Sequence, residues 1–318
     1  MKILAVVSTI LLLTSARRLS PKESRYWKLF CGQKHLCFGD DNDEFKSLYG
    51  EMEKGRTAPW VVSILYRGNF MGTGTIISPY HILTAAHLVG ITANDCKTGA
   101  GGHYERSAGD FSVYANVTCA TPEVCHEEGR EDIFIGKTVD RIFIPRGYVG
   151  ESCAGRESMN DLAIFQVINP FKFSEDVYPA CLPQNAPQVG DKTRLHGFGK
   201  DPSEKTHYSS MLLKGITSTV IKCPENGQIT PIRMFCTSAD NHGLACAGDS
   251  GSGVIHHRPG SETPEVVGIL STGASCEIVL YDQQSSRKSN TPLESYPDWL
   301  TNVYDYRQFI CNATGLCY

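Results

Sequence analysis

A glycine-rich run around one serine holds the components of nucleophilic catalysis. The run is Gly248-Asp249-Ser250-Gly251-Ser252-Gly253. A serine hydroxyl attacks a carbonyl carbon once a base removes its proton, and the oxyanion that forms needs N–H donors already in place. The glycines allow a sharp turn in which the serine oxygen and two backbone N–H groups face one carbonyl group. The run predicts Ser250 as a nucleophile, with an ordinary Gly- and Ser-rich turn as the plain alternative.

Two upstream segments offer the base and the acid that such a serine needs. One is Thr84-Ala85-Ala86-His87, and the other is Asn160-Asp161 followed by the apolar Leu162-Ala163-Ile164. Taken singly, His87 fits a structural histidine and Asn160-Asp161 a turn that leads into a strand. The chain order His, Asp, Ser is one of three known for this catalytic set. The three residues together therefore predict acyl-transfer chemistry.

These segments, with several others, resemble the trypsin/chymotrypsin-like serine proteases from about Ser47 to Phe309. The additional matches are Ala58-Pro59-Trp60, Pro179-Ala180-Cys181-Leu182-Pro183, Met234-Phe235-Cys236, Ser271-Thr272-Gly273 and Val303-Tyr304-Asp305-Tyr306. The resemblance implies that His87 accepts the proton of Ser250 and that Asp161 orients the imidazole. It also implies an oxyanion hole formed by the backbone N–H groups of Gly248 and Ser250, and a serine endopeptidase that needs no cofactor.

The fold expected is all-β. Short β-branched runs broken by Gly and Pro predict strands at 59–65, 74–77, 82–84, 161–165 and 266–270. This pattern indicates a sandwich or a barrel. The resemblance selects two six-stranded antiparallel barrels with the active site between them, and a C-terminal helix from Tyr304 to about Cys311 is the one long helix expected.

The resemblance also locates the substrate pocket. Leu244 stands where trypsin-like members have an aspartate, while Asp298 stands where the family usually has glycine, on the opposite wall. We expect Asp298 to favour Lys or Arg before the scissile bond, with a solvent-facing Asp as the equal alternative. Ser271 and Gly273 are expected to pair with the substrate backbone.

Activation is expected at Lys46-Ser47. In the family, cleavage frees an N-terminal ammonium, which pairs with the carboxylate at the position of Asp249, since a buried carboxylate needs a cation. Ser47 would be that new terminus, although the family usually has a branched apolar residue there. A zymogen cut after Lys46 and an uncut loop lysine both stay open.

The chain has 318 residues and a net charge of −4, with charges of both signs mixed along it. This mixture gives no basis for nucleic-acid or anionic-membrane binding. An apolar run over 3–13 followed by Thr14-Ser15-Ala16 predicts a signal peptide at 1–16, too short to span a bilayer. The expected organisation is this signal peptide, a propeptide at 17–46 and a protease domain at 47–318, in a secreted monomer that meets protein or peptide substrates and protein inhibitors.

Thirteen cysteines in a secreted chain predict disulfides, and their odd number leaves one thiol free or bonded to another chain. The resemblance implies the pairs Cys223–Cys236 and Cys246–Cys276, and Cys181 with Cys31 or Cys37. Two bridges usual in the family lack both partners: Gly72 and Leu88 occupy one pair of positions, and Thr193 and His256 the other. A paired loss indicates a divergent branch.

Residues from about 96 to 153 exceed the family length and are expected to form a disulfide-rich insertion containing Cys96, Cys119, Cys125 and Cys153. A metal site at Cys125-His126 is the alternative, but an oxidising compartment favours disulfides and no paired Cys-x-x-Cys motif is present. The pairing of Cys311 and Cys317 is left open. Asn116 and Asn312 begin glycosylation sequons.

Three functional classes remain on sequence alone. The first is a serine endopeptidase. The second is a protease-fold binding protein without catalysis, and the third is an esterase that uses the same residues, because fold and site do not determine the acyl donor.

Overall fold

The structure, a computed structural model, describes the backbone and side chains of most of the chain. The ranges are 17–31, 58–90, 106–148, 160–200, 211–224, 233–240, 245–257, 263–273, 275–278, 281 and 296–317, with the backbone alone for 46–47 and 50–52. The predicted signal peptide lies outside the described residues, as do Cys37, Cys96, Cys153 and Leu244. No helix within the described ranges is both long and apolar enough to cross a membrane.

Barrel 1 is a closed antiparallel sheet with the strand order β3-β4-β5-β8-β7-β6. Its strands are β3 (Val61–Tyr66), β4 (Asn69–Ser78), β5 (His81–Thr84), β6 (Phe111–Ala115), β7 (Ile135–Phe143) and β8 (Ala163–Val167). Strands β5 and β8 are buried along their whole length, whereas β6 alternates buried and half-buried residues. This alternation places one face of β6 in the barrel core, because successive side chains of a strand point to opposite faces.

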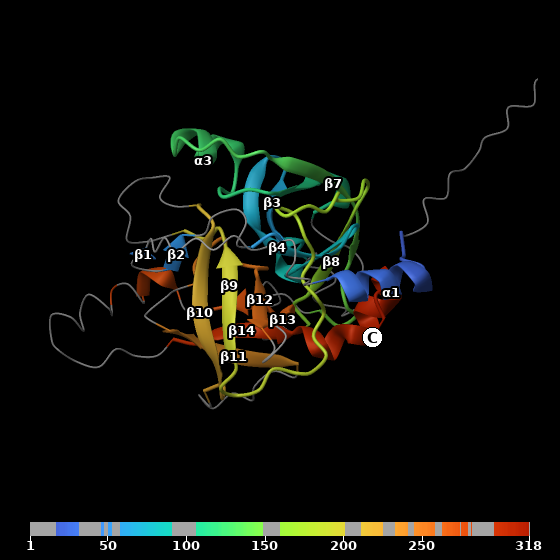
Figure 1. Ribbon diagram of the computed structural model, residues 1–318. Coiled ribbons are helices and arrows are strands. Elements are labelled where there is room, and N and C mark those ends of the chain that lie inside the picture. The colour runs from blue at the N-terminus through green and yellow to red at the C-terminus, as the bar shows by residue number, and fades with distance from the viewer. Residues whose placement is uncertain are drawn as a thin grey trace, which may run out of the picture.

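Barrel 2 closes in the order β9-β10-β11-β14-β13-β12, since β12 pairs back with β9 (Figure 1). Its strands are β9 (Lys192–Gly197), β10 (Lys214–Ile221), β11 (Met234–Ala239), β12 (Gly253–His257), β13 (Pro264–Thr272) and β14 (Asp298–Asn302). A short hairpin of β1 (Lys46–Ser47) and β2 (Gly50–Met52) adds to the start of β10. The prediction of two six-stranded antiparallel barrels is confirmed.

The helices differ from the single long one expected. The C-terminal helix consists of a 3₁₀ turn, η5 (Val303–Tyr306), that continues into α5 (Arg307–Thr314). A longer helix, α1 (Pro21–Phe30), was not expected, although its start carries a clear signal. Ser20 and Glu23 form a capping box and Pro21 occupies the first helical turn. Other helical segments among the described residues include η2 (Ala86–Leu88), η3 (Ala108–Asp110) and α3 (Pro122–Glu127).

The N-terminal segment with α1 lies against the C-terminal end of the chain (Figure 1). The backbone N–H of Leu19 donates to Thr314 O at 2.7 Å, and Cys317 N donates to Ser24 Oγ at 3.3 Å. The disulfide Cys31–Cys181 joins the end of α1 to the segment between the barrels. The predicted propeptide is therefore packed on the body of the protein and linked to it covalently.

Five disulfides are present among the described residues. Three are pairs that the resemblance implies, namely Cys31–Cys181, Cys223–Cys236 and Cys246–Cys276. The other two each close a short loop: Cys119–Cys125 at α3 and Cys311–Cys317 after α5.

For each of the two missing family bridges, the two positions that would hold the cysteines are neighbours in space. Other side chains occupy these positions. A Cβ placed on Gly72 would lie 2.9 Å from Leu88 Cδ1, so the leucine occupies the space of the first bridge. His256 pairs directly with Thr193 across β12 and β9, and Thr193 Oγ1 lies 2.9 Å from Ser218 Oγ. Apolar packing at one position and hydrogen bonding at the other thus replace the two covalent links.

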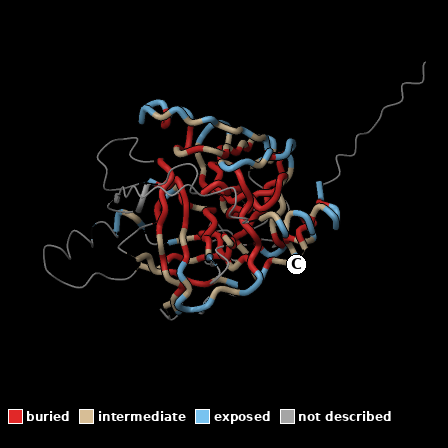
Figure 2. Tube along the Cα trace, in the orientation of Figure 1, coloured by how far each residue is buried: buried red, intermediate tan, exposed pale blue. Residues whose placement is uncertain are grey.

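Figure 2 shows that the buried residues follow the strands of both barrels, while α1 and α3 present exposed faces. The core of barrel 1 extends to the aromatic Tyr306 of η5 and to Ile310 of α5. Barrel 2 has a smaller apolar cluster that includes Leu195, Val254 and Leu300. Residues 106–148, which cover much of the expected insertion, contain β6 and β7 of barrel 1 as well as α3.

Gly315→Ala tests the contact between the chain ends. Gly315 has φ +83°, and an added Cβ would lie 2.2 Å from Leu19 O. We expect a loss of about 1–3 kcal/mol in the free energy of unfolding, because both the left-handed backbone and the contact resist a side chain. Chemical denaturation measures it, with Gly109→Ala as the control, since a Cβ there meets nothing within 4 Å. Equal stability of the two variants would contradict the packing described.

Candidate active site

The pairing of β5 with β8 brings together two residues that are 74 positions apart. Thr84 lies opposite Ala163, so the turn after β5 and the turn before β8 share one end of barrel 1. His87 in the first turn and Asp161 in the second form two hydrogen bonds: His87 N donates to Asp161 Oδ1 at 2.9 Å, and His87 Nδ1 lies 2.8 Å from Oδ2. The carboxylate therefore holds both the backbone and the ring of His87.

Barrel 2 also binds Asp161. Ser271 Oγ on β13 donates to Asp161 Oδ2 at 2.6 Å, and Thr301 Oγ1 on β14 donates to the backbone carbonyl of Asp161 at 2.8 Å. The preceding Asn160 has φ +58° and is held by the Tyr306 hydroxyl at 2.7 Å. The position of Asp161 is thus determined from both barrels.

The electrostatic environment keeps this acid ionised. Asp161 is 1 % exposed, and burial by itself raises the pKa of its carboxyl. The charge of His87 and the hydrogen bonds from His87 and Ser271 act in the opposite direction and lower the pKa below its ordinary value. An ionised carboxylate at Nδ1 favours an imidazole with its proton on that nitrogen, which leaves Nε2 able to accept one.

The turn with Ser250 is fastened to β4 of barrel 1. Thr73 N donates to Ser250 O at 2.9 Å, and Thr73 Oγ1 donates to Gly248 O at 3.1 Å. Gly248 and Gly251 both have positive φ, +102° and +81°, and a Cβ on Gly251 would lie 2.2 Å from Thr84 Oγ1. Glycine is needed at both positions because the backbone conformation and the close packing exclude a side chain.

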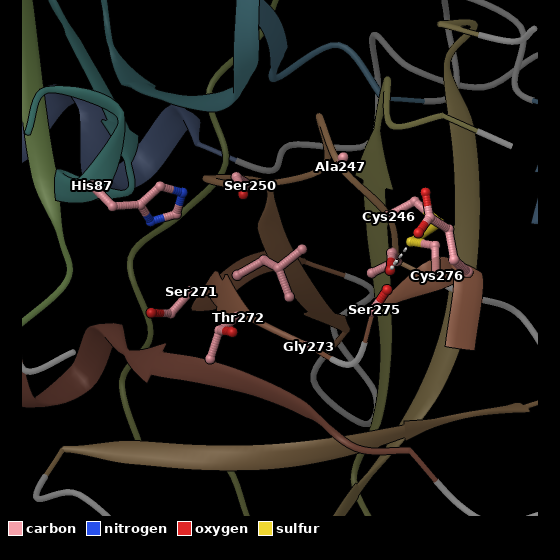
Figure 3. A pocket seen from close by; sticks show the side chains of 12 residues that line it. His87, Cys246, Ala247, Ser250, Ser271, Thr272, Gly273, Ser275 and Cys276 are labelled. Carbon is pink, nitrogen blue, oxygen red and sulfur yellow. Dashed lines mark hydrogen bonds between the residues drawn. A yellow bond between two sulfur atoms is a disulfide. The ribbon is translucent and has the colours of Figure 1, made fainter. Parts of the chain in front are cut away.

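A cleft of about 510 Å³ joins these groups (Figure 3). His87 and Ser250 line one end, and the wall continues along β13 through Ser271 and Thr272. The disulfide Cys246–Cys276 lies at the other end. In Figure 3 the ring of His87 is directed toward the side on which Ser250 lies.

Residues 49–300 of the chain match the Trypsin family model. The chain belongs to the trypsin family. It is 26 % identical over 275 residues to Trypsin-like protease try-5 of Caenorhabditis elegans, covering 77 % of this chain and 82 % of the relative. It is 25 % identical over 292 residues to Melanization protease 1 of Drosophila melanogaster, covering 86 % and 67 %. Membership in the trypsin family supports a serine protease function for this protein.

The substrate-pocket residues proposed from the trypsin-family pattern are partly described. Gly273 is exposed and lines the cleft, and Asp298 Oδ1 lies 2.8 Å from the position a Cβ on Gly273 would occupy. Asp298 is 8 % exposed, so it is a buried acid directly behind the cleft wall and not a solvent-facing one. Burial raises the pKa of Asp298 to about 7, with Asp249 raising it and Lys214 lowering it.

Asp249 is fully buried and has a cation beside it. Lys214 Nζ, at the start of β10, lies 3.1 Å from Asp249 Oδ2. Lys214 is the residue at this site that sequence reasoning missed. A lysine between Leu212-Leu213 and Gly215-Ile216 was the available signal, since a charge in an apolar strand is seldom buried without a partner.

Ser47, the expected new terminus of a cut trypsin-family chain, is part of β1. Its backbone pairs with that of Gly50, and β2 in turn pairs with Lys214 and Gly215 of β10. The partners of Asp249 in this uncut chain are the N–H groups of Gly199 and Cys246 and the ammonium of Lys214.

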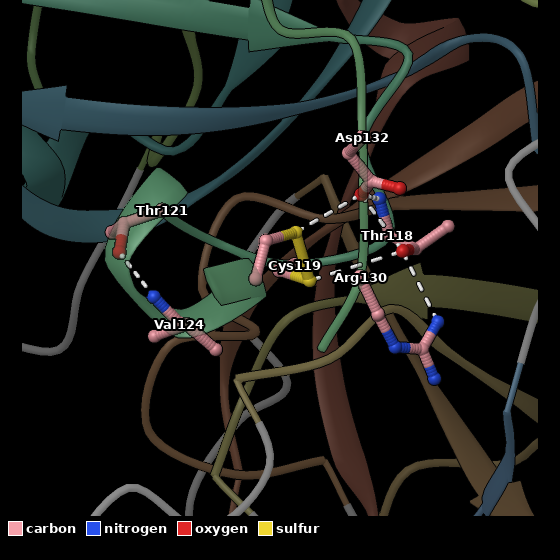
Figure 4. Close-up of a disulfide and its surroundings, with 7 residues drawn as sticks. Thr118, Cys119, Thr121, Val124, Arg130 and Asp132 are labelled. Carbon is pink, nitrogen blue, oxygen red and sulfur yellow. Dashed lines mark hydrogen bonds between the residues drawn. A yellow bond between two sulfur atoms is a disulfide. The ribbon is translucent and has the colours of Figure 1, made fainter. Parts of the chain in front are cut away.

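The cysteines at α3 form a disulfide, so Cys125 does not offer a thiolate to a metal (Figure 4). Asp132 lies within 4.8 Å of both sulfurs and accepts a hydrogen bond from Thr118 Oγ1 at 2.8 Å. The carboxylate thus anchors the loop around the bridge.

Of the two glycosylation sequons, Asn116 is half-buried at a positive φ of +59°, and Asn312 is exposed on α5.

The raised pKa of Asp298 predicts a pH-dependent stability. Between the ordinary pKa and about 7, the folded chain keeps a proton that the unfolded chain has lost, so the wild type loses stability as pH rises through this window. In Asp298→Asn this loss is absent. We expect the variant to gain in unfolding free energy relative to wild type, by on the order of a few kcal/mol, as pH rises from 4 to 7.5. Urea denaturation at several pH values measures the difference, and a constant difference would contradict the buried position of this acid.

Proposed function

We propose that this protein is a serine endopeptidase in which Ser250 is the nucleophile, His87 the general base and Asp161 the residue that orients it. The supporting observation is the buried Asp161 carboxylate, which bonds His87 Nδ1 at 2.8 Å, while His87 and Ser250 line the same cleft. His87 would take the Ser250 proton as Oγ attacks the scissile carbonyl, and would pass it to the leaving amine as the peptide bond breaks. Water would then hydrolyse the acyl-enzyme by the same transfers in reverse order.

The N–H groups of Gly248 and Ser250 are proposed to bind the oxyanion. Within the described part of the chain neither N–H donates to a protein acceptor, so both remain available for a substrate. The positive φ of Gly248 and the bond from Thr73 to its carbonyl hold this peptide in one orientation. Donors fixed before the reaction stabilise the transition state without reorganisation.

We further propose that the protein is secreted, that 1–16 is removed and that cleavage after Lys46 leaves 17–46 attached through Cys31–Cys181. Protein and peptide substrates and protein inhibitors would bind the cleft, and Asn116 and Asn312 are candidate glycosylation sites. The apolar run at 3–13 and the cysteine content support an extracellular location.

A fluorophosphonate probe tests the enzyme against the non-catalytic binding protein. We expect covalent labelling of wild type, no labelling of Ser250→Ala, and a loss of at least about 10⁴-fold in kcat for His87→Ala. Ser107→Ala, an exposed serine outside the cleft, serves as the control and should label normally. A folded wild type that never labels would support the binding protein, and a peptide library beside ester substrates separates peptidase from esterase.

The buried acid behind the cleft supports a preference for Lys or Arg before the scissile bond. A basic side chain that enters the cleft would meet the Asp298 carboxylate in a poorly solvated site, where opposite charges attract strongly. The acid is ionised only above its raised pKa of about 7. We therefore propose a preference that strengthens with pH, together with tolerance of apolar residues at low pH.

The ratio of kcat/KM for an Arg substrate to that for a Leu substrate measures this preference, since the protonation of His87 cancels in the ratio. We expect the ratio to rise roughly tenfold between pH 5.5 and pH 8, following ionisation of Asp298. In Asp298→Asn the ratio should be low and independent of pH, while Asp305→Asn, an exposed acid on η5, should behave as wild type. An unchanged preference in Asp298→Asn would exclude this acid as the determinant.

A further inference from the structure

The carboxylate of Asp249 occupies a pocket formed by backbone. Gly199 N donates to Oδ1 at 2.7 Å and Cys246 N donates to Oδ2 at 2.8 Å. A Cβ added to Gly197 or Gly199 would lie 2.3 Å or 2.2 Å from its oxygens, so the strand itself encloses the group. Asp249 has no exposed surface. Two N–H donors do not neutralise a buried carboxylate, so a cation is required there.

Lys214 supplies this cation within the uncut chain. Its Nζ lies 3.1 Å from Asp249 Oδ2, and it also donates to the carbonyls of Gly199 at 3.1 Å and Lys200 at 3.3 Å. An ammonium has three N–H donors, and all three acceptors here are protein oxygens. The side chain is 7 % exposed, and its strand position is opposite Gly197, which places it beside the carboxylate.

Asp249 is also the central residue of the turn that carries the proposed oxyanion donors. Its own N–H donates to Cys246 O at 2.9 Å, and its carbonyl accepts from Ser252 N at 2.9 Å. Gly248 and Ser250 are its two neighbours in the chain. Any force that holds the Asp249 side chain inward therefore also determines the orientation of the two flanking peptides.

We infer that Lys214 is a positioning residue that holds Asp249 in place of a new N-terminal ammonium, so that the chain is catalytically competent before any cleavage at Lys46-Ser47. The inference rests on the proposed function. It differs from the activation scheme expected from the sequence, in which the cation arrives only after cleavage. Here the ion pair exists while residues 46–47 are still part of the hairpin with β2. Cleavage then has little effect on the catalytic rate.

The decisive variant is Lys46→Ala, which removes the expected cleavage site. We expect the full chain, shown to be uncut on a reducing gel, to be labelled by a fluorophosphonate and to hydrolyse a peptide ester within about threefold of the wild type cut after Lys46. N-terminal sequencing of that cut form should begin at Ser47. This comparison does not depend on the folding of any Lys214 variant.

Replacing the cation tests Lys214 itself. In the Lys46→Ala background, Lys214→Met should lower kcat about 100-fold or more with a smaller change in KM, because a misplaced donor mainly costs transition-state binding. The control is Lys192→Met, an exposed lysine on the neighbouring strand that pairs with Asp240 at 2.8 Å and should leave kcat unchanged. When Lys46 is kept, so that the cleavage site is present, cleavage after Lys46 should restore the activity of Lys214→Met. The free ammonium of the new N-terminus can then replace the ammonium of Lys214. A second variant, Lys214→Ala, should regain rate with added ethylammonium and not with propane.

The outcomes separate the two claims. Labelling of the cut wild type but not of the uncut Lys46→Ala chain would overturn the inference and show that Lys214 holds an inactive precursor, while the proposed function would stand. Full activity of folded Lys214→Met would also overturn it. Absence of labelling in both the cut and the uncut wild-type protein would instead refute the proposed function.

Discussion

The buried carboxylate of Asp161 is the contact on which the rest of this structure depends. It accepts hydrogen bonds from His87 on barrel 1 and from Ser271 on barrel 2, while Thr301 holds its backbone. A buried charge must be matched by donors, and here those donors come from both barrels. These contacts join barrel 2 to the turn of barrel 1 that holds His87, beside the cleft that His87 and Ser250 line.

A second group of charges lies on the barrel 2 side of that cleft. Lys214 pairs with the buried Asp249, and its ammonium also lowers the pKa of the buried Asp298, so one cation acts on two buried acids. Two carboxylates and one cation cannot all be paired, so one acid bears the cost of burial, and the pKa of about 7 assigns that cost to Asp298. The turn that carries Ser250 and the wall behind Gly273 are therefore linked electrostatically through one lysine.

At the positions of the two missing family disulfides, neighbouring side chains replace the covalent links. Leu88 fills the space beside Gly72, and a hydrogen-bonded Thr193 beside His256 occupies the second missing bridge. Two further disulfides, Cys119–Cys125 and Cys311–Cys317, each close a loop of a few residues. Short loops lose little chain entropy when closed, so these bridges stabilise local geometry more than the fold as a whole.

The amino-acid sequence by itself determined short β strands, and its resemblance to the trypsin family added the two barrels. Ser250, His87 and Asp161 could be proposed from sequence because each lies in a short motif that is recognisable without knowledge of distant residues. The capping box of α1 is equally local, so this helix could also have been predicted from the sequence. Only the tertiary structure decided that Asp298 is buried and that Lys214 neutralises Asp249. Both depend on which strands become neighbours, and the environment of a charge is set by residues distant in the chain.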